Sequence, residues 1–269
     1  SSMKPAFKSV LKLTFALMYV AFIFIQNAST ASAIVGGEDA VAGEQPWVVG
    51  IVLADEPNGY YGQFCGGTLI AESWVLTAAH CTINQENRPF EANDLDVLVG
   101  RLELTSSEGE RIRVARIVRH AGFDLMTYAN DIALLELESP DEHPTIRLAG
   151  MTVDSGNQES TRNVATVKSI MQQSGMEFLV EPSAGRAVLV TKRSKSQATP
   201  KRDEVTVFGW GITDAGHGAY ILQKATLPMV PNHRCQNAYT SYGITITDKM
   251  LCAGFALGGA DSCVGDSGG

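Results

Sequence analysis

The chain has 269 residues, of which 45% are hydrophobic and 19% are charged, and its formal net charge at pH 7 is −8. This is the composition of an ordinary globular protein with one large or two small domains. Acidic and basic residues are interspersed, so the sequence offers no basic face for nucleic acid, and the acidic balance mainly favours solubility.

The first 33 residues differ in composition from the rest of the chain. Lysines at 4, 8 and 12 precede an uncharged apolar run at 13–25, and small polar residues follow, ending in Ala-Ser-Ala at 31–33. A basic start, an apolar run and a small-x-small exit are typical of a secretory signal peptide. An uncleaved membrane anchor needs about 17–25 apolar residues, and this run is too short. We therefore expect residues 1–33 to be a signal peptide.

Export to an oxidising compartment affects how the five cysteines are interpreted. They are Cys65, Cys81, Cys235, Cys252 and Cys263. No two lie close enough in sequence for a metal-binding knuckle, so disulfide bonds are the better interpretation. Pairing of neighbours suggests Cys65–Cys81 and Cys235–Cys252, each closing a loop of about 15 residues and worth roughly 3 kcal/mol. Cys263 is left without a partner.

The region after the leader predicts short strands. The β-branched or apolar runs are 47–53, 67–70, 74–77, 97–99, 112–118, 132–137, 188–191 and 205–209. Clusters of Gly, Asn, Asp and Ser separate them, and no long stretch keeps a 3.6-residue apolar period. Many short strands at this spacing indicate an all-β barrel or sandwich.

A polar, turn-rich segment lies at about residues 151–203. It carries basic runs at 192–195 and 201–202. We interpret it as a solvated loop, and the alternative is a basic patch that binds a partner.

Two motifs in the first half of the chain carry candidate acid–base chemistry. His80 ends the small-residue run of LTAAHC at 76–81, and the cysteine that follows can fix its loop. A His needs an orienting acid and a nearby nucleophile to act as a general base. Asp131, in NDIALL at 130–135, leads directly into an apolar strand. Burying its charge there is costly unless it is matched, and a His N–H is a suitable match.

The third motif is GDSGG at 265–269, which contains Ser267. Flanking glycines let the backbone turn tightly and leave the serine Oγ open to an incoming carbonyl, so the motif suits a nucleophile. Taken alone, the motif also fits an ordinary Gly/Ser turn. The nucleophile elbow of α/β-hydrolases is excluded by chain order, because its acid and His follow the serine.

Together these segments resemble the chymotrypsin–trypsin family of serine proteases. The matching segments, in the family's order, are IVGG at 34–37, CGGTLI at 65–70, AAHC at 78–81, NDIALL at 130–135, GWG at 209–211 and GDSGG at 265–269. The resemblance spans residues 34–269. It implies an all-β fold of two six-stranded antiparallel Greek-key barrels of the chymotrypsin type, and a secreted serine endopeptidase working through an acyl-enzyme.

The resemblance assigns roles to individual residues. Ser267 is the nucleophile, and His80 is its general base and then the acid for the leaving amine. Asp131 fixes the imidazole tautomer and stabilises the imidazolium. The backbone N–H groups of Gly265 and Ser267 form the oxyanion hole, which is worth about 3–4 kcal/mol per donor.

Substrate preference is implied by Asp261, which matches the pocket-base position of trypsin-like members. A fixed carboxylate in a narrow slot favours a substrate Arg or Lys, because a neutral side chain leaves it buried and unpaired. Ser262 adds a possible hydrogen bond to the substrate cation.

The resemblance also implies activation from a zymogen. The free amine of Ile34, made by cleavage after Ala33, turns inward, pairs with Asp266 and shapes the oxyanion loop. Zymogens of this kind are commonly opened after Lys or Arg, so Ala33 is unusual. Signal peptidase either exposes Ile34 directly or cuts after Ala31 or Ala28 and leaves a short propeptide stub. We favour direct or near-direct exposure.

The sequence departs from the family pattern in three ways. Members usually continue well past GDSGG, so we expect a fragment with an incomplete second barrel, no activity of its own and a missing partner for Cys263. The stretch between Asp131 and Trp210 is long, which suggests a loop inserted around 151–203. Arg101 stands where the calcium loop of many trypsins has a carboxylate, so we expect no metal, and no other cofactor is implied.

The expected partners follow from the same resemblance. They are protein or peptide substrates and protein protease inhibitors, with no nucleic acid and no membrane once the signal is removed. We expect a monomer that is secreted, or periplasmic if the source is bacterial. The rival hypotheses are a non-catalytic protease homologue that serves as a binding module, and an enzyme tethered by a retained leader. Such homologues typically lose a triad member, and this chain keeps all three.

Overall fold

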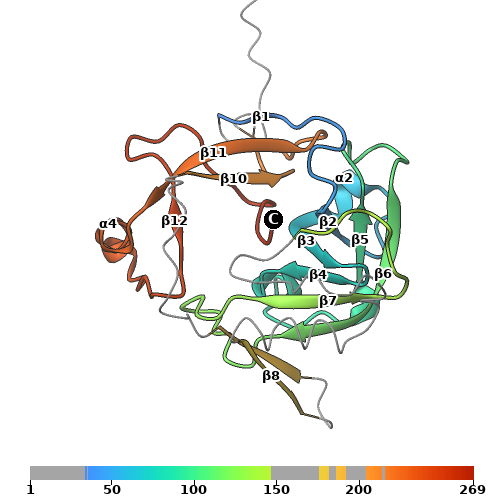
Figure 1. Cartoon of the computed structure of the whole chain (residues 1–269), viewed down its shortest axis with the longest axis horizontal. Coiled ribbons are helices and arrows are strands. Elements are labelled where there is room, and N and C mark those ends of the chain that lie inside the picture. The colour runs from blue at the N-terminus through green and yellow to red at the C-terminus, as the bar shows by residue number, and fades with distance from the viewer. Residues whose placement is uncertain (1–33, 35, 147–175, 182–185, 192–203, 214–215) are drawn as a thin grey trace, which may run out of the picture. The chain divides into compact units, whose positions relative to one another are not determined.

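The computed structural model describes residues 34, 36–146, 176–181, 186–191, 204–213 and 216–269 (Figure 1). The predicted signal peptide and most of the predicted loop at 151–203 lie outside the described residues. Among the helices that are described, none has the length and apolar character needed to cross a membrane.

Six strands in the first half of the chain form a closed antiparallel barrel (Figure 1). Around the barrel their order is β2-β3-β4-β7-β6-β5. The bounds are β2 Val48–Leu53, β3 Gln63–Ala71, β4 Trp74–Thr77, β5 Leu95–Val99, β6 Glu110–Arg119 and β7 Ala133–Leu137. The barrel confirms the predicted all-β fold, and each strand falls on one of the apolar runs of the sequence.

The inside of the barrel is filled by β-branched and leucine side chains. Its fully buried members include Val49, Ile51, Leu69, Val97 and Leu135. Burying one such side chain contributes about 1.5–3 kcal/mol, so this cluster is a major source of the fold's stability. Cys81, the residue that follows His80, belongs to the same cluster.

A second, open sheet is built from the later part of the chain. Strand β11 (Gln223–Val230) pairs with β1 (Glu38–Asp39), β10 (Glu204–Gly209) and β12 (Cys252–Ala253). This sheet agrees with the expected incomplete second barrel. Strand β11 was not predicted, because the segment QKATLPMV is partly polar and contains a proline, so it shows no continuous apolar run.

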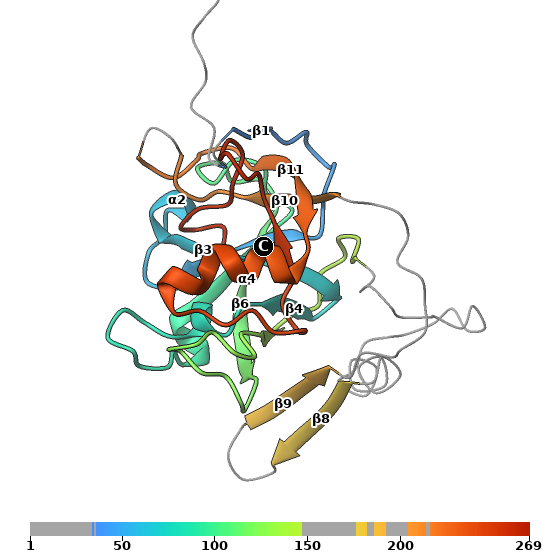
Figure 2. The same ribbon diagram turned by 90° about the vertical axis from the view of Figure 1, so that its left-hand side faces the viewer.

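A hairpin lies within the segment that the sequence predicted to be a loop. Strands β8 (Met176–Glu181) and β9 (Arg186–Thr191) pair antiparallel (Figure 2). Strand β9 contains the predicted run at 188–191. Strand β8 was not predicted, although its residues FLV are favourable for a strand.

The described helices are short. They are α2 Gly59–Gly62, η1 His80–Thr82, η2 Ala92–Asp94, α4 Asn232–Tyr239 and η3 Thr240–Tyr242. Helix α4 (Figure 2) was not predicted, because its sequence NHRCQNAY has no apolar stripe. Its one buried residue is Cys235, which forms a disulfide.

The two predicted disulfides are both present. Cys65 bonds to Cys81 across 16 residues of sequence, and Cys235 bonds to Cys252 across 17. Cys263 is a free, half-buried cysteine. The first bond joins strand β3 to the turn that carries His80, and the second joins helix α4 to strand β12.

Removing the Cys65–Cys81 bond is expected to lower the free energy of unfolding by about 3 kcal/mol, because the unfolded chain regains the entropy of the closed loop. Chemical denaturation of the Cys65→Ala/Cys81→Ala double variant measures this loss. The corresponding Cys235→Ala/Cys252→Ala variant is the matched comparison, since its loop has nearly the same length. Unchanged unfolding midpoints in both variants would show that the bonds contribute nothing to stability.

Candidate active site

His80 and Asp131 come from the ends of two paired strands. His80 begins helix η1 three residues after strand β4, and Asp131 lies two residues before strand β7. Strands β4 and β7 are antiparallel neighbours, and Thr77 faces Ala133 in their register. The loop leaving one strand and the loop entering the other therefore lie at the same end of the barrel.

The two side chains are in direct contact. The Nδ1 atom of His80 lies 2.7 Å from Oδ2 of Asp131, and the backbone N–H of His80 donates to Oδ1 at 2.8 Å. The side chains are 29% and 19% exposed, so water still reaches part of the pair. A carboxylate accepts hydrogen bonds, so Nδ1 carries the proton and Nε2 is left as the acceptor of a neutral ring. This is the tautomer that a general base requires.

Unusual backbone angles shape the approach to Asp131. Asn130 and Tyr128 have φ values of 54° and 53°, in the left-handed region where residues other than glycine are uncommon. The side chain of Asn130 donates to the carbonyl of Gly122 at 2.8 Å and so holds this turn. The ring of Tyr128 stands edge-on to that of His80, with centroids 5.8 Å apart. Tyr128 was not predicted as a site residue, since no motif marks it.

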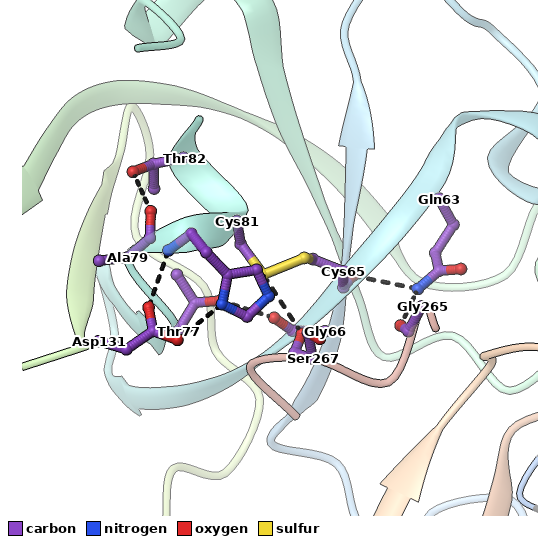
Figure 3. Close-up of a disulfide and its surroundings, with 11 residues drawn as sticks. Gln63, Cys65, Gly66, Thr77, Ala79, Cys81, Thr82, Asp131, Gly265 and Ser267 are labelled. Atoms are coloured by element: carbon purple, nitrogen blue, oxygen red, sulfur yellow. Dashed lines mark hydrogen bonds and ion pairs between the residues drawn. A yellow bond between two sulfur atoms is a disulfide. The ribbon is translucent and has the colours of Figure 1, made fainter. Parts of the chain in front are cut away.

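Ser267 and its neighbours pack against the first barrel. The backbone N–H of Gly66, in strand β3, donates to the carbonyl of Ser267 at 2.8 Å. Figure 3 shows Ser267 next to Gly66 and the Cys65–Cys81 disulfide. Gly268 has a φ of 86°, and a Cβ there would lie 2.2 Å from Oγ1 of Thr77. Only glycine fits between the serine and strand β4.

The serine hydroxyl and the imidazole do not form a hydrogen bond with each other. Within the described residues no hydrogen bond connects Oγ of Ser267 to His80. The Nε2 atom of His80 lies 3.7 Å from Sγ of Cys81, and this sulfur lies 3.5 Å from the carbonyl oxygen of Ser267. The structure therefore brings the serine segment to the same disulfide as His80 but leaves the predicted nucleophile–base contact open.

The residue before the serine is buried. Asp266 accepts hydrogen bonds from the backbone N–H groups of Gly211, at 2.7 Å, and Cys263, at 2.8 Å. Burial raises the pKa of Asp266, and these two hydrogen bonds oppose the rise. A Cβ on Gly209 would lie 2.0 Å from Oδ1, so the GWG motif at 209–211 makes room for this carboxylate.

The other predicted member of the activation pair lies in an apolar cluster. Ile34 is fully buried and packs with Ala225 and Leu227 of strand β11. The described contacts of the Asp266 carboxylate are the two backbone N–H groups, and none of them involves Ile34. The pairing of the Ile34 amine with Asp266 stays a prediction.

Gly265 is held by Gln63, which was not predicted as a site residue. Its φ is 98°, and its carbonyl accepts a hydrogen bond from Nε2 of Gln63 at 2.8 Å (Figure 3). Gln63 begins strand β3, next to the register shift between β2 and β3. It therefore connects the first barrel to the loop before Ser267.

The predicted substrate-binding residues lie at the surface. Asp261 and Ser262 are both exposed, and Oδ1 of Asp261 accepts a hydrogen bond from the backbone N–H of Ser262 at 2.8 Å. The described residues do not enclose Asp261 in a slot. Its place at the base of a substrate pocket stays a prediction.

One cluster of potential metal ligands lies at the site. Atoms of Cys65, His80 and Cys81 lie within 4.8 Å of one another. Both sulfurs are joined in a disulfide, so neither is a thiolate that could bind a metal. The cluster does not fit a metal ion.

Comparison with known proteins gives consistent results. The family model described as Trypsin matches residues 34–269. A trypsin of Phaedon cochleariae is 33% identical over 239 residues, which cover 88% of this chain and 72% of that protein. A trypsin of Saccharopolyspora erythraea is 32% identical over 237 residues, covering 88% of this chain and 80% of that protein. An ovochymase of Halocynthia roretzi is 33% identical over 248 residues, or 91% of this chain, but this stretch is only 12% of the ovochymase.

Proposed function

We propose, from the premise that this chain belongs to the trypsin family of serine proteases, that the protein is a secreted endopeptidase cleaving after Arg or Lys. The observation that carries the proposal is the double contact of His80 with the carboxylate of Asp131. It orients the imidazole and selects the tautomer that a general base needs. Secretion is supported by the two disulfides and by the leader-like sequence at 1–33.

The proposed reaction begins at Ser267. Its Oγ attacks the carbonyl carbon of the scissile bond while Nε2 of His80 takes the hydroxyl proton. The imidazolium that forms is stabilised by Asp131, 2.7 Å from Nδ1. His80 then returns the proton to the leaving amine, and an acyl-enzyme remains. Water attacks this ester by the same base catalysis, which releases the acid product and restores Ser267.

The negative charge that develops on the substrate oxygen needs hydrogen-bond donors. We assign this role to the backbone N–H groups of Gly265 and Ser267. In the part of the chain that the structure describes, neither group donates to another residue, so both are available. Each such donor is worth about 3–4 kcal/mol in the transition state. The hydrogen bond between Gln63 and the carbonyl of Gly265 supports the assignment by restraining this loop.

The contact between Ser267 and His80 is part of the proposal. We assign its formation to activation, when the Ile34 amine becomes the partner of Asp266. Asp266 directly precedes Ser267, so a change in its hydrogen bonds moves the serine. Hydrogen bonds of catalytic residues are often long in proteins without substrate and tighten in the complex.

Changing Asp261 to serine is expected to lower kcat/KM for substrates with Arg or Lys before the scissile bond by about 10⁴-fold, because their cation loses its carboxylate partner. A peptide library varied at this position measures the effect. Asp248→Ser is the matched control, since Asp248 is also an exposed aspartate of the same region. A wild-type protein that prefers Phe or Ala at this position would contradict the assignment of Asp261.

A further inference from the structure

The side chain of Arg119 makes contacts unlike those of the other arginines on its strand. Its Nε donates to Oγ1 of Thr82 at 2.5 Å, and its Nη2 donates to the carbonyls of Thr82, at 2.9 Å, and Phe90, at 2.7 Å. Among the described residues no carboxylate forms an ion pair with it. Arg111, Arg113 and Arg116, on the same strand β6, bind Asp96, Glu138 and Glu136 respectively.

The guanidinium of Arg119 is partly buried, and it donates hydrogen bonds to uncharged oxygens of Thr82 and Phe90. Burial accordingly lowers the pKa of Arg119. A surface ion pair contributes little to stability, and an arginine placed only for solubility would stay in water. The planar guanidinium instead donates to three acceptors at once, which indicates that this side chain fixes the geometry of the backbone around it.

The backbone fixed in this way is the turn that carries His80. Helix η1 begins at His80 and ends at Thr82, whose side chain is fully buried. Oγ1 of Thr82 donates to the carbonyl of Ala79 at 2.6 Å, so one hydroxyl joins the start of the turn to Arg119. A basic side chain near the end of a helical turn can hydrogen-bond its last carbonyls.

The backbone of Arg119 belongs to the strand pair that leads from Asp131. Arg119 is the last residue of β6 and pairs with Ala133 of β7, two residues after Asp131. The next residue, His120, donates its N–H to the carbonyl of Ile132 at 3.1 Å. The backbone of Arg119 therefore pairs with strand β7 two residues after Asp131, and its side chain lies at the turn of His80.

We propose that Arg119 is a positioning residue that holds His80 and Asp131 in register with each other. Its backbone is fixed to the strand that follows Asp131, and its guanidinium holds the end of the turn that begins at His80. The 2.7 Å contact between the two side chains depends on this connection. The catalytic consequence rests on the proposed function, whereas the positioning of the imidazole does not.

The test is Arg119→Met, which keeps a flexible, unbranched side chain and removes its hydrogen-bond donors. Nuclear magnetic resonance of the ¹⁵N-labelled protein follows the Nδ1 proton of His80, which its hydrogen bond to Asp131 protects from exchange with water. We expect this proton to exchange with water about 10-fold faster or more in the variant. We also expect kcat to fall about 10- to 100-fold with KM within twofold, as misplaced catalytic groups produce. Arg119→Lys keeps the charge but not the planar set of donors, so its exchange rate and kcat should lie between those of the wild type and Arg119→Met.

Arg113→Met is the matched control, because Arg113 is on the same strand and its side chain is 73% exposed. Thr82→Val is the second route, since it removes the connecting hydroxyl with little change in volume, and it should reproduce the faster exchange. If Arg119→Met does not fold, the exchange rate in Thr82→Val tests the positioning role of Arg119 instead. Wild-type exchange in either folded variant overturns the proposal. If the full-length wild-type protein hydrolyses no peptide, the proposed function fails, while the exchange rates still decide the role of Arg119.

Discussion

Replacing Ser267 with alanine in the full-length protein is expected to lower kcat for peptide hydrolysis by about 10⁶-fold, because the variant has no atom that can form the acyl-enzyme. KM should change little, since the hydroxyl contributes little to ground-state binding. Turnover of a peptide amide measures the loss. A fluorophosphonate probe should label the wild-type protein at Ser267 and leave the variant unlabelled.

The controls for this prediction use the coupling of the proposed residues. His80→Ala should cost nearly as much as Ser267→Ala, and the double variant should be little worse than either, because groups that act as a unit are not additive. Ser241→Ala, at an exposed serine in helix η3, should have wild-type kcat. Full amidase activity in Ser267→Ala would exclude the proposed mechanism and favour a different nucleophile.

The first barrel was predictable because its strands carry strong local signals. Segments such as WVLT at 74–77 and ALLEL at 133–137 are short, apolar and bounded by polar residues, and they form β4 and β7. The cysteine spacing was equally informative, since each pair of sequence neighbours closes one loop. In these places the local chemistry and the tertiary structure require the same conformation.

The second sheet was harder to predict because tertiary contacts determine it. Strand β11 alternates between buried and more exposed positions only over 223–227, before Pro228, and it is a strand because three others pair with it. Helix α4 is short and polar, and its disulfide to strand β12 fixes its position. Neither segment carries enough local preference to be recognised alone.

In the candidate active site, too, some residues were predictable from local motifs and others were not. The motifs led to His80, Asp131 and Ser267, and the structure brings the first two into contact. Gln63 and Arg119 were missed, because each acts by donating to backbone carbonyls. Such a role requires only a donor at the right place, and a sequence gives no sign of which carbonyl will lie there.

The buried carboxylate of Asp266 leads to the last prediction. The pKa of Asp266 is raised in the folded protein. Its stabilising contribution is therefore fully present only at a pH below the pKa that Asp266 has in the unfolded chain. This stabilising contribution is lost as the pH rises through the folded pKa, so near neutrality the charged carboxylate is costly to bury. A positive partner offsets this cost and lowers the pKa again. We propose that the free amine of Ile34 is this partner.

Activity should therefore require a chain that begins at Ile34. A form that keeps Ser32 and Ala33 carries its ammonium two residues too far out and leaves Asp266 without a charged partner, at a cost of about 3–5 kcal/mol, or a few hundred-fold or more in activity. The comparison uses two forms of one precursor, cleaved after Ala31 or after Ala33.

N-terminal sequencing of the active secreted protein should read Ile-Val-Gly-Gly. Activity should fall at high pH as the amine deprotonates, above an ordinary α-amino pKa of about 7.7–8.0 because the carboxylate favours the charged form. The chains that begin at Ser32 and at Ile34 should unfold the first barrel at similar denaturant concentrations, since that barrel does not depend on the pairing of the Ile34 amine with Asp266. A fully active form that begins at Ser32 refutes the activation mechanism and leaves the roles of His80, Asp131 and Ser267 intact.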